Sequence, residues 1–185
     1  FNPRLHLNRI GVVNQTTMLA NETETIANLL HQAMISRYGK ENSRNHFIDT
    51  KDTLCYATKE NQDATLALIE EGADLAIIVG GYNSSNTSHL VELCEAHMPT
   101  YFIRDASELV SSKQIRHLDI HTKTLMDTIN WLPERGEGNT IEIILTAGAS
   151  CPDVLLDEVI RKIISWFPDK ISINQAISSY KNIRQ

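Results

Sequence analysis

Three short polar segments of this chain each follow a run of apolar residues and precede a predicted helix. They are residues 14–17, 80–86 and 146–150, and they are rich in Ser, Thr, Asn and Gly. At the carboxyl ends of parallel strands, such turns lie where ligands usually bind. Helix N-termini there present unpaired N–H groups and a partial positive charge. Small neutral donors added to them suit the binding of an anion, and of phosphate in particular.

Helix capping is the alternative interpretation of each turn, because Ser, Thr and Asn are the commonest N-cap residues. Capping accounts for one polar side chain per turn. It does not account for Ser84, Ser85 and Asn86 in succession, or for the adjacent Thr16 and Thr17. The sequence has no GxGxxG or GxxxxGK[ST] motif, which disfavours a dinucleotide site or a P-loop.

The three cysteines are Cys55, Cys94 and Cys151. Their odd number and wide spacing argue against a disulfide framework and favour reduced, intracellular thiols. Cys55 directly precedes a predicted helix, whose N-terminus would favour a thiolate; a buried apolar role is the alternative. Cys94 fits the buried role, since it falls on the apolar face of a predicted helix. Cys151 adjoins the third polar turn, and its role stays open. The histidines show no HExxH or comparable metal-binding spacing.

The elements that must position these residues alternate along the chain. We expect strands at residues 9–13, 74–79, 100–103 and 141–145. We expect helices at residues 21–39, 56–71 and 84–96 and after Pro152. Asn21 is the expected N-cap of the first helix, with Ile26, Leu29, Leu30, Ala33 and Met34 on its apolar face. Residues 110–132 fit one or two further helices, and residues 171–185 fit either a strand or a helix.

Alternating strands and helices predict an α/β fold with a largely parallel sheet. The 185 residues, 42% of them hydrophobic, suffice for one ordinary domain or two small ones. We expect residues 1–50 to end one small α/β unit, residues 51–167 to form a complete unit, and residues 168–185 to form a tail. The net charge of −6 argues against a nucleic-acid partner. No apolar segment is long enough for a membrane span. Because the chain begins with Phe1 and has no signal-peptide pattern, we expect a fragment or a processed product.

Four segments of the sequence closely resemble the 4-hydroxy-3-methylbut-2-enyl diphosphate reductase family. They are GVVNQTTML, DTLCYATKENQDA, IIVGGYNSSNTSHL and TAGASCPDVLLDEVI, and they occur in the order typical of the family between about residues 11 and 160. The segment from Ala20 to Phe47 resembles the cyanobacterial and plastid branch. The resemblance therefore implies a location in the bacterial cytoplasm or the plastid stroma.

The resemblance also implies three similar α/β units with pseudo-threefold symmetry around a central [4Fe–4S] cluster, each unit giving one cysteine. Cys55 matches the third cluster cysteine of the family. Thr16 matches a threonine that helps position the substrate hydroxyl and its proton donor; Thr17 is its neighbour. The residues matching the family's diphosphate-binding positions are Ser84, Ser85, Asn86 and Ser150.

The implied reaction is the last step of the methylerythritol phosphate route to isoprenoids. It is the reductive dehydroxylation of (E)-4-hydroxy-3-methylbut-2-enyl diphosphate to isopentenyl and dimethylallyl diphosphate, with electrons from a ferredoxin- or flavodoxin-type donor. The family's two other cluster cysteines, its diphosphate-binding histidines and its proton-donor glutamate have no counterpart here, and neither Cys94 nor Cys151 matches them. The chain thus resembles the C-terminal part of the enzyme, and we expect it to hold no stable cluster without the missing N-terminal part. A non-catalytic phosphate- or nucleotide-binding domain and an inactive structural fragment are the alternatives.

Overall fold

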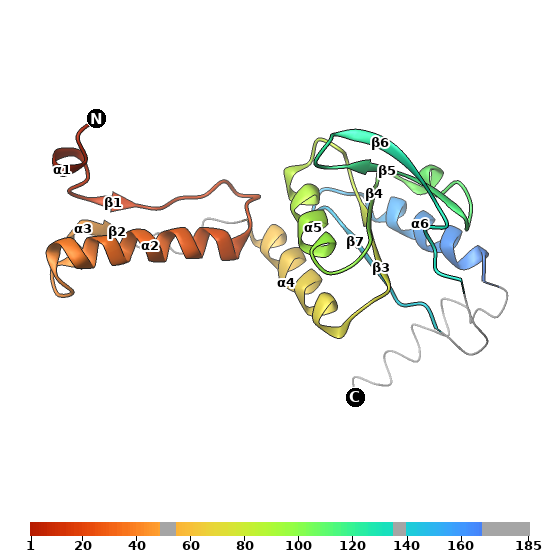
Figure 1. Cartoon of the computed structure of the whole chain (residues 1–185), viewed down its shortest axis with the longest axis horizontal. Coiled ribbons are helices and arrows are strands. Elements are labelled where there is room, and N and C mark those ends of the chain that lie inside the picture. The colour runs from red at the N-terminus through yellow and green to blue at the C-terminus, as the bar shows by residue number, and fades with distance from the viewer. Residues whose placement is uncertain (49–54, 135–139, 168–185) are drawn as a thin grey trace.

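The computed structural model describes residues 1–48, 55–134 and 140–167, and it divides into an arm and a body (Figure 1). The arm contains α1 (Pro3–His6), β1 (Ile10–Gly11), α2 (Ala20–Tyr38), α3 (Ser43–His46) and β2 (Phe47–Ile48). The body contains α4 (Tyr56–Glu71), β3 (Leu75–Val79), α5 (Ser85–Glu95), β4 (Thr100–Ile103), the 3₁₀ helix η1 (Ala106–Glu108), β5 (Gln114–Asp119), β6 (Thr124–Ile129), β7 (Ile143–Ala147) and α6 (Asp153–Ser165).

A five-stranded sheet in the order β6-β5-β4-β3-β7 forms the centre of the body. The pairs β3–β4 and β3–β7 are parallel, whereas β4–β5 and β5–β6 are antiparallel. Every residue of β3 is buried, as its uninterrupted apolar sequence requires. Side chains of α6 pack on one face of the sheet and side chains of α5 on the other. The predicted α/β fold is confirmed, but the sheet is mixed, with two parallel and two antiparallel strand pairs among the described residues, where a largely parallel sheet was expected.

The helices expected within residues 110–132 are wrong, because β5 and β6 form an antiparallel hairpin there. Its exposed strand β6 carries Leu125, Met126 and Ile129 at 53%, 45% and 61% exposure, so its apolar residues do not mark a buried helix face. The turn has no Asn-Gly or Asp-Gly signature. Instead Asp119 Oδ1 accepts hydrogen bonds from two backbone N–H groups of the turn, and Lys123 adopts a left-handed backbone with φ of 55°.

In the arm, the predicted helix is present, but its start and its buried face differ from expectation. Helix α2 begins at Ala20 with Leu19 as its N-cap, while the Asn21 side chain accepts a hydrogen bond from the N–H of Glu22 inside the first turn. Met34 is buried as expected. The remaining large members of the predicted face, Ile26, Leu29 and Leu30, are 48%, 71% and 36% exposed. The described residues cover this side of α2 only in part, and the described part of the arm has no sheet larger than the two-stranded pair β1–β2.

The other expected elements agree closely with the structure. Helix α4 has the predicted ends, and Gly72 follows it with φ of 85°. The arm strand is shorter than expected, and β7 starts two residues later than its prediction. The expected tail, residues 168–185, lies outside the described residues, as does the expected boundary between the first two units near residue 50.

Helix α4 joins the arm to the body through polar side chains. Its buried residues are Thr58, Gln62 and Thr65, whereas Leu66 is 38% exposed. Gln62 accepts a hydrogen bond from Ala20 N at 3.2 Å and donates one to Met18 O at 3.0 Å. This amide therefore fixes the segment just before α2 against the body.

Thr87 occupies the space between two strand ends. Its side chain is 1% exposed, and a Cβ atom built on Gly80 would lie 2.7 Å from its Oγ1 atom. A Cβ atom on Gly148 would clash with the same Oγ1 atom. Glycine at both positions is what allows the first turn of α5 to sit against the ends of β3 and β7.

We expect Gly148→Ala to lower the free energy of unfolding by roughly 1–3 kcal/mol, because it overpacks this contact. Gly81→Ala is the matched control, since a Cβ atom at Gly81 meets nothing within 4 Å. Urea denaturation of both variants measures the difference. In a Thr87→Ala background, the added cost of Gly148→Ala should shrink. An equal cost in both backgrounds would show that Thr87 is not the obstacle.

Candidate functional site

The register of the parallel strands sets two of the polar turns side by side. Val79, the last residue of β3, pairs with Ile103 on one side and with Ala147 on the other. The N–H of Gly148 donates to Val79 O at 3.0 Å. The turns after β3 and β7 therefore leave the sheet at the same level, as the sequence predicted for two of its three polar segments.

Ser84 is the N-cap of α5. Its hydroxyl oxygen accepts hydrogen bonds from Thr87 N at 3.3 Å and from Thr87 Oγ1 at 2.9 Å. Capping therefore accounts for this residue, as the alternative interpretation held. It does not account for the two residues that follow, Ser85 and Asn86.

Asn86 is 5% exposed, yet neither its amide nitrogen nor its amide oxygen has a hydrogen-bond partner in the described part of the chain. Leaving such a group unpaired costs about 1–3 kcal/mol, so buried amides in native proteins are nearly always bonded. The side chain belongs to the first turn of α5, where the backbone N–H groups also lack helical partners. The Asn86 amide is therefore a buried donor and acceptor that the described residues leave without a partner.

The third polar turn reaches this place from the arm. Thr17 Oγ1 and Ser85 Oγ form a hydrogen bond of 2.8 Å, although the two residues lie 68 positions apart. The carbonyl oxygen of Thr16 accepts a hydrogen bond from the N–H of Cys55 at 3.3 Å. Thr16 and Cys55 are both exposed. The arm thus brings the candidate threonines to the N-termini of both α5 and α4.

Ser150 is exposed in the turn after β7. No hydrogen bond joins its hydroxyl to the described residues of the other two turns, so it is a neighbour of the group rather than bonded to it. The turn itself is fixed, since Cys151 N donates to Gly148 O at 2.8 Å and Asn61 Nδ2 donates to Ala147 O at 3.0 Å. Asn61 falls within the DTLCYATKENQDA segment, but its spacing alone gave it no role.

Tyr82 and Glu108 hold the loop that leads to Ser84, and the sequence gave no signal for this pair. The Tyr82 hydroxyl donates to Glu108 Oε2 at 2.5 Å, and the Tyr82 ring packs edge-on against Phe102. Glu108 is 4% exposed and also accepts from the N–H and the Nε–H of Arg104. Burial, followed by the hydrogen bond to Glu108, raises the pKa of the Tyr82 hydroxyl. The loop is therefore anchored by a neutral phenol.

Cys55 is the most accessible of the three thiols. It is exposed and stands at the N-terminus of α4 without a side-chain capping bond. Burial in the core raises the pKa of Cys94 to about 11. Burial, with a smaller effect of Asp153, raises the pKa of Cys151. Among the described residues, no group of three or more His, Cys, Asp or Glu side chains could hold a metal ion. These residues do not fit a complete iron–sulfur site; they supply one exposed cysteine.

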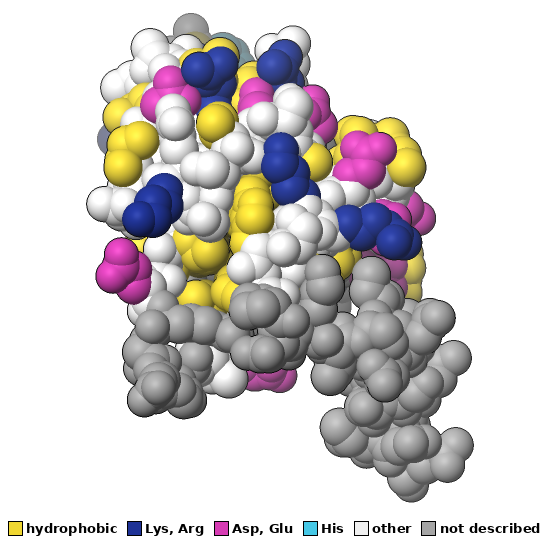
Figure 2. All heavy atoms as spheres, turned by 90° about the vertical axis from the view of Figure 1, so that its right-hand side faces the viewer, with side chains coloured by type: hydrophobic (Ala, Val, Ile, Leu, Met, Phe, Trp, Pro, Cys, Tyr) yellow, Lys and Arg dark blue, Asp and Glu magenta, His cyan; other side chains and the backbone are white. Residues whose placement is uncertain are grey.

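The side chains of the candidate site are neutral, so its attraction for an anion comes from N–H and O–H dipoles. Charged side chains are dispersed elsewhere. On the face of the body turned away from the arm, Lys, Arg, Asp and Glu alternate with apolar and uncharged groups (Figure 2). Within the described ranges, no helix combines the length and apolar character needed to cross a bilayer.

Comparison with known proteins gives consistent matches. The family model described as "LytB protein" matches residues 2–164. The 4-hydroxy-3-methylbut-2-enyl diphosphate reductase of Gloeobacter violaceus is 48% identical over 164 residues, covering 88% of this chain and 38% of that protein. The reductase of Thermosynechococcus vestitus is 43% identical over 166 residues, covering 89% of this chain and 40% of that protein.

A solved structure of (E)-4-hydroxy-3-methyl-but-2-enyl diphosphate reductase is also similar. It shares 26% sequence identity, with a TM-score of 0.43, and the match covers 85% of this chain and 44% of that one. A TM-score this low carries no detail of the site.

The chain spans about two fifths of the length of the curated relatives that it matches. The match to the family model covers most of the chain, from the arm to α6. It includes every candidate residue described above. This chain therefore belongs to the LytB family, whose cyanobacterial members that it matches are 4-hydroxy-3-methylbut-2-enyl diphosphate reductases.

Proposed function

We propose that this chain is the diphosphate-binding, C-terminal part of a 4-hydroxy-3-methylbut-2-enyl diphosphate reductase. The observation that carries the proposal is the buried, unpaired amide of Asn86 at the N-terminus of α5. The relatives' names support the substrate, because each names a diphosphate. In this proposal the whole enzyme has three units. Residues 1–50 are the end of its middle unit, residues 51–167 are its third unit, and residues 168–185 are a C-terminal tail.

The anion is held by donors from neighbouring segments. The amide N–H of Asn86, the Ser84 and Ser85 hydroxyls and the free N–H groups of the first turn of α5 converge on one side. The Ser150 hydroxyl joins them from the adjoining turn. Because all these donors are neutral, the grip does not change as the solution pH moves across the neutral range. Helix N-termini with added hydroxyl donors are well suited to phosphate groups.

The other end of the substrate points toward Thr16 and Cys55. Thr16 is the chain neighbour of Thr17, which bonds to Ser85, and the carbonyl oxygen of Thr16 accepts from Cys55 N, so these contacts link Cys55 through the arm to the first turn of α5. In this arrangement Thr16 orients the substrate hydroxyl. A [4Fe–4S] group, when bound, supplies the electrons for the reductive loss of that hydroxyl.

The chain provides Cys55 as one ligand to that group, and two further cysteines must come from the rest of the reductase. That missing N-terminal part is therefore the first partner that we propose, and a ferredoxin- or flavodoxin-type protein is the electron donor. The expected compartment is the bacterial cytoplasm or the plastid stroma, by likeness to the cyanobacterial relatives.

A second candidate function is an anion-binding fragment without redox activity. It is favoured by the single exposed thiol in the described residues. The two candidates share the diphosphate site and differ only in whether Cys55 ever binds iron.

We expect Asn86→Ala to weaken the binding of inorganic pyrophosphate roughly tenfold, because it removes a charge-assisted hydrogen bond. The free energy of unfolding should not fall by more than about 1 kcal/mol, since the amide has no partner among the described residues. Isothermal titration calorimetry and urea denaturation measure the two quantities. Asn83→Ala, at an exposed position of the same loop, is the control. Equal pyrophosphate affinity in the two variants would contradict the role of Asn86.

The thiols should differ in their reaction with iodoacetamide at pH 8. Cys55 is exposed and should react first, whereas Cys94 should react only on unfolding because burial raises its pKa to about 11. Cys151 should be intermediate, since it is partly buried and its pKa is also raised. Mass spectrometry of peptides after timed labelling gives the order. Rapid labelling of Cys94 in the native chain would mean that the α5 packing is wrong.

A chimera tests the iron–sulfur assignment. In it, this chain replaces the matching region of the Gloeobacter violaceus reductase. We expect the chimera to bind a [4Fe–4S] cluster after anaerobic reconstitution, Cys55→Ser to lose it, and Cys151→Ser to keep it. Iron and sulfide analysis and the visible absorption band give the result. Retention of full cluster content in Cys55→Ser would leave only the redox-inactive candidate.

A further inference from the structure

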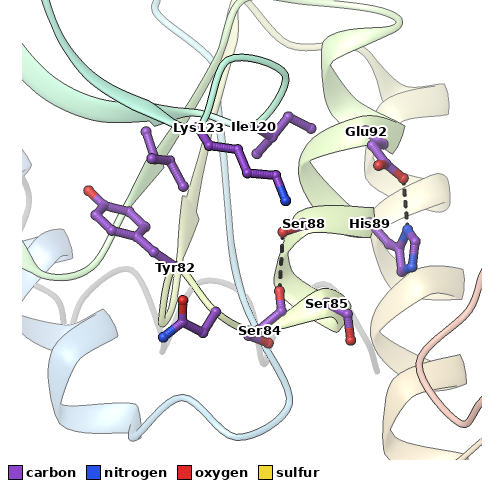
Figure 3. Close-up of a pocket in the computed structure, with 10 residues that line it drawn as sticks. Tyr82, Ser84, Ser85, Ser88, His89, Glu92, Ile120 and Lys123 are labelled. Atoms are coloured by element: carbon purple, nitrogen blue, oxygen red, sulfur yellow. Dashed lines mark hydrogen bonds and ion pairs between the residues drawn. The ribbon is translucent and has the colours of Figure 1, made fainter.

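We propose that Thr87 is a positioning residue that directs the hydroxyl proton of Ser84 toward a bound anion. This role rests on the proposed function, because it takes the anion site at the N-terminus of α5 as given. Figure 3 shows the side chains of Ser84 and Ser85 at the N-terminal end of α5, with Glu92 further along the helix. Thr87 belongs to the same first turn, and it was not among the site residues that the sequence predicted.

The Ser84 hydroxyl oxygen already accepts as many hydrogen bonds as it can. A serine oxygen has two lone pairs and carries one proton. Thr87 N donates to this oxygen at 3.3 Å, and Thr87 Oγ1 donates to it at 2.9 Å. Ser84 can therefore meet a ligand only by donating its own proton. Within the described ranges, no hydrogen bond joins that proton to another residue.

Packing fixes the orientation of the Thr87 side chain, which is 1% exposed. A Cβ atom built on Gly80 would lie 2.7 Å from Thr87 Oγ1 and 3.0 Å from Thr87 Cγ2, so both branches of the side chain are enclosed. A Cβ atom on Gly148 would clash with Oγ1. A β-branched side chain is stiff about its first torsion even when it is exposed. The Thr87 hydroxyl is therefore held in one direction, toward Ser84.

The Ser84 oxygen lies beside the turn that follows β7, because a Cβ atom built on Gly148 would be 3.7 Å from Ser84 Oγ. Its two bonds from Thr87 both come from the first turn of α5, so they occupy the side of the oxygen that faces the helix. The Ser84 side chain is half-buried, and its proton is left for the open side. The N–H groups of the first turn point to the same side, where an anion approaches a helix N-terminus.

The bonds from Thr87 strengthen anion binding in two ways. The Ser84 proton is already oriented, so less conformational freedom is lost when the anion binds. A hydroxyl group that accepts hydrogen bonds is also polarised, which makes it a stronger donor. Thr87 contributes both effects without adding a charge and without touching the anion.

Reinforcement of the helix cap is the alternative role for the same hydrogen bond. In that case Thr87 would matter for stability and would not affect ligand affinity. Two variants separate the roles. Thr87→Val keeps the branched shape and loses the hydroxyl group, whereas Thr87→Ser keeps the hydroxyl group and loses the buried methyl group.

Calorimetric titration of the whole chain with pyrophosphate, together with urea denaturation, is the test. We expect Thr87→Val to weaken pyrophosphate binding about fivefold, because the Ser84 proton loses its fixed direction. Thr87→Ser should bind pyrophosphate like the unmodified chain, although the lost methyl group lowers its resistance to urea. Thr65→Val is the matched control, since Thr65 is also 1% exposed and donates its hydroxyl to Asn61 O at 2.7 Å. It should leave pyrophosphate affinity unchanged.

A Ser84→Ala background shows whether the effect passes through Ser84. There Thr87→Val should cause no further loss of pyrophosphate affinity. A loss that persists in this background would overturn the role of Thr87, as would equal affinity in Thr87→Val and Thr65→Val. Failure of the proposed function has a different result. In that case Asn86→Ala would match Asn83→Ala in pyrophosphate affinity, and the role of Thr87 would fail with it.

Discussion

The candidate site depends on one packing constraint, the seating of Thr87 between the ends of two parallel strands. The pairing of Val79 with Ala147 ends β3 and β7 at the same level. The absence of a side chain at Gly80 and Gly148 then lets α5 begin directly above them. Every donor of the site follows from this arrangement. Asn86 is buried because the helix starts so close to the sheet, and the turn that carries Ser150 lies alongside because its strand ends there.

Hydrogen bonds between residues distant in sequence then hold the polar turns of the candidate site in position. Thr17 and Ser85 come from different parts of the chain, and their hydroxyl groups meet at 2.8 Å. Gln62 holds the same segment of the arm against α4, while Tyr82 and Glu108 hold the loop before α5. Each of these contacts positions a turn without adding a charge to it. In the proposed function, the body would therefore bind the anion through neutral donors, and the redox groups would approach from the side of Cys55.

The sequence predicted the body better than it predicted the arm and the hairpin. The helix predicted over residues 56–71 matches α4, and the uninterrupted apolar run placed β3, because the signals for both elements are local. The hairpin of β5 and β6 was missed because exposed Leu125 and Met126 imitate a helix face and Lys123 replaces the glycine usual in such turns. Asn61, Tyr82 and Glu108 were missed for another reason. Their partners are distant in sequence, so no local pattern reports them. The unpaired state of Asn86 is likewise a property of the folded chain alone.

The partly exposed apolar side of α2, with Ile26, Leu29 and Leu30, bears on how firmly the arm keeps its structure. A two-stranded sheet such as β1–β2 is marginally stable by itself, and Ile26 and Leu29 remain 48% and 71% exposed, so they contribute only part of the stabilisation that full burial would give. In the proposed function, the turn with Thr16 and Thr17 meets the ligand only while the arm lies against α4 and α5. A polypeptide that buried the apolar side of α2 would stabilise the arm's own fold, and the turn that the arm carries would then keep its position without any contact between that polypeptide and the ligand.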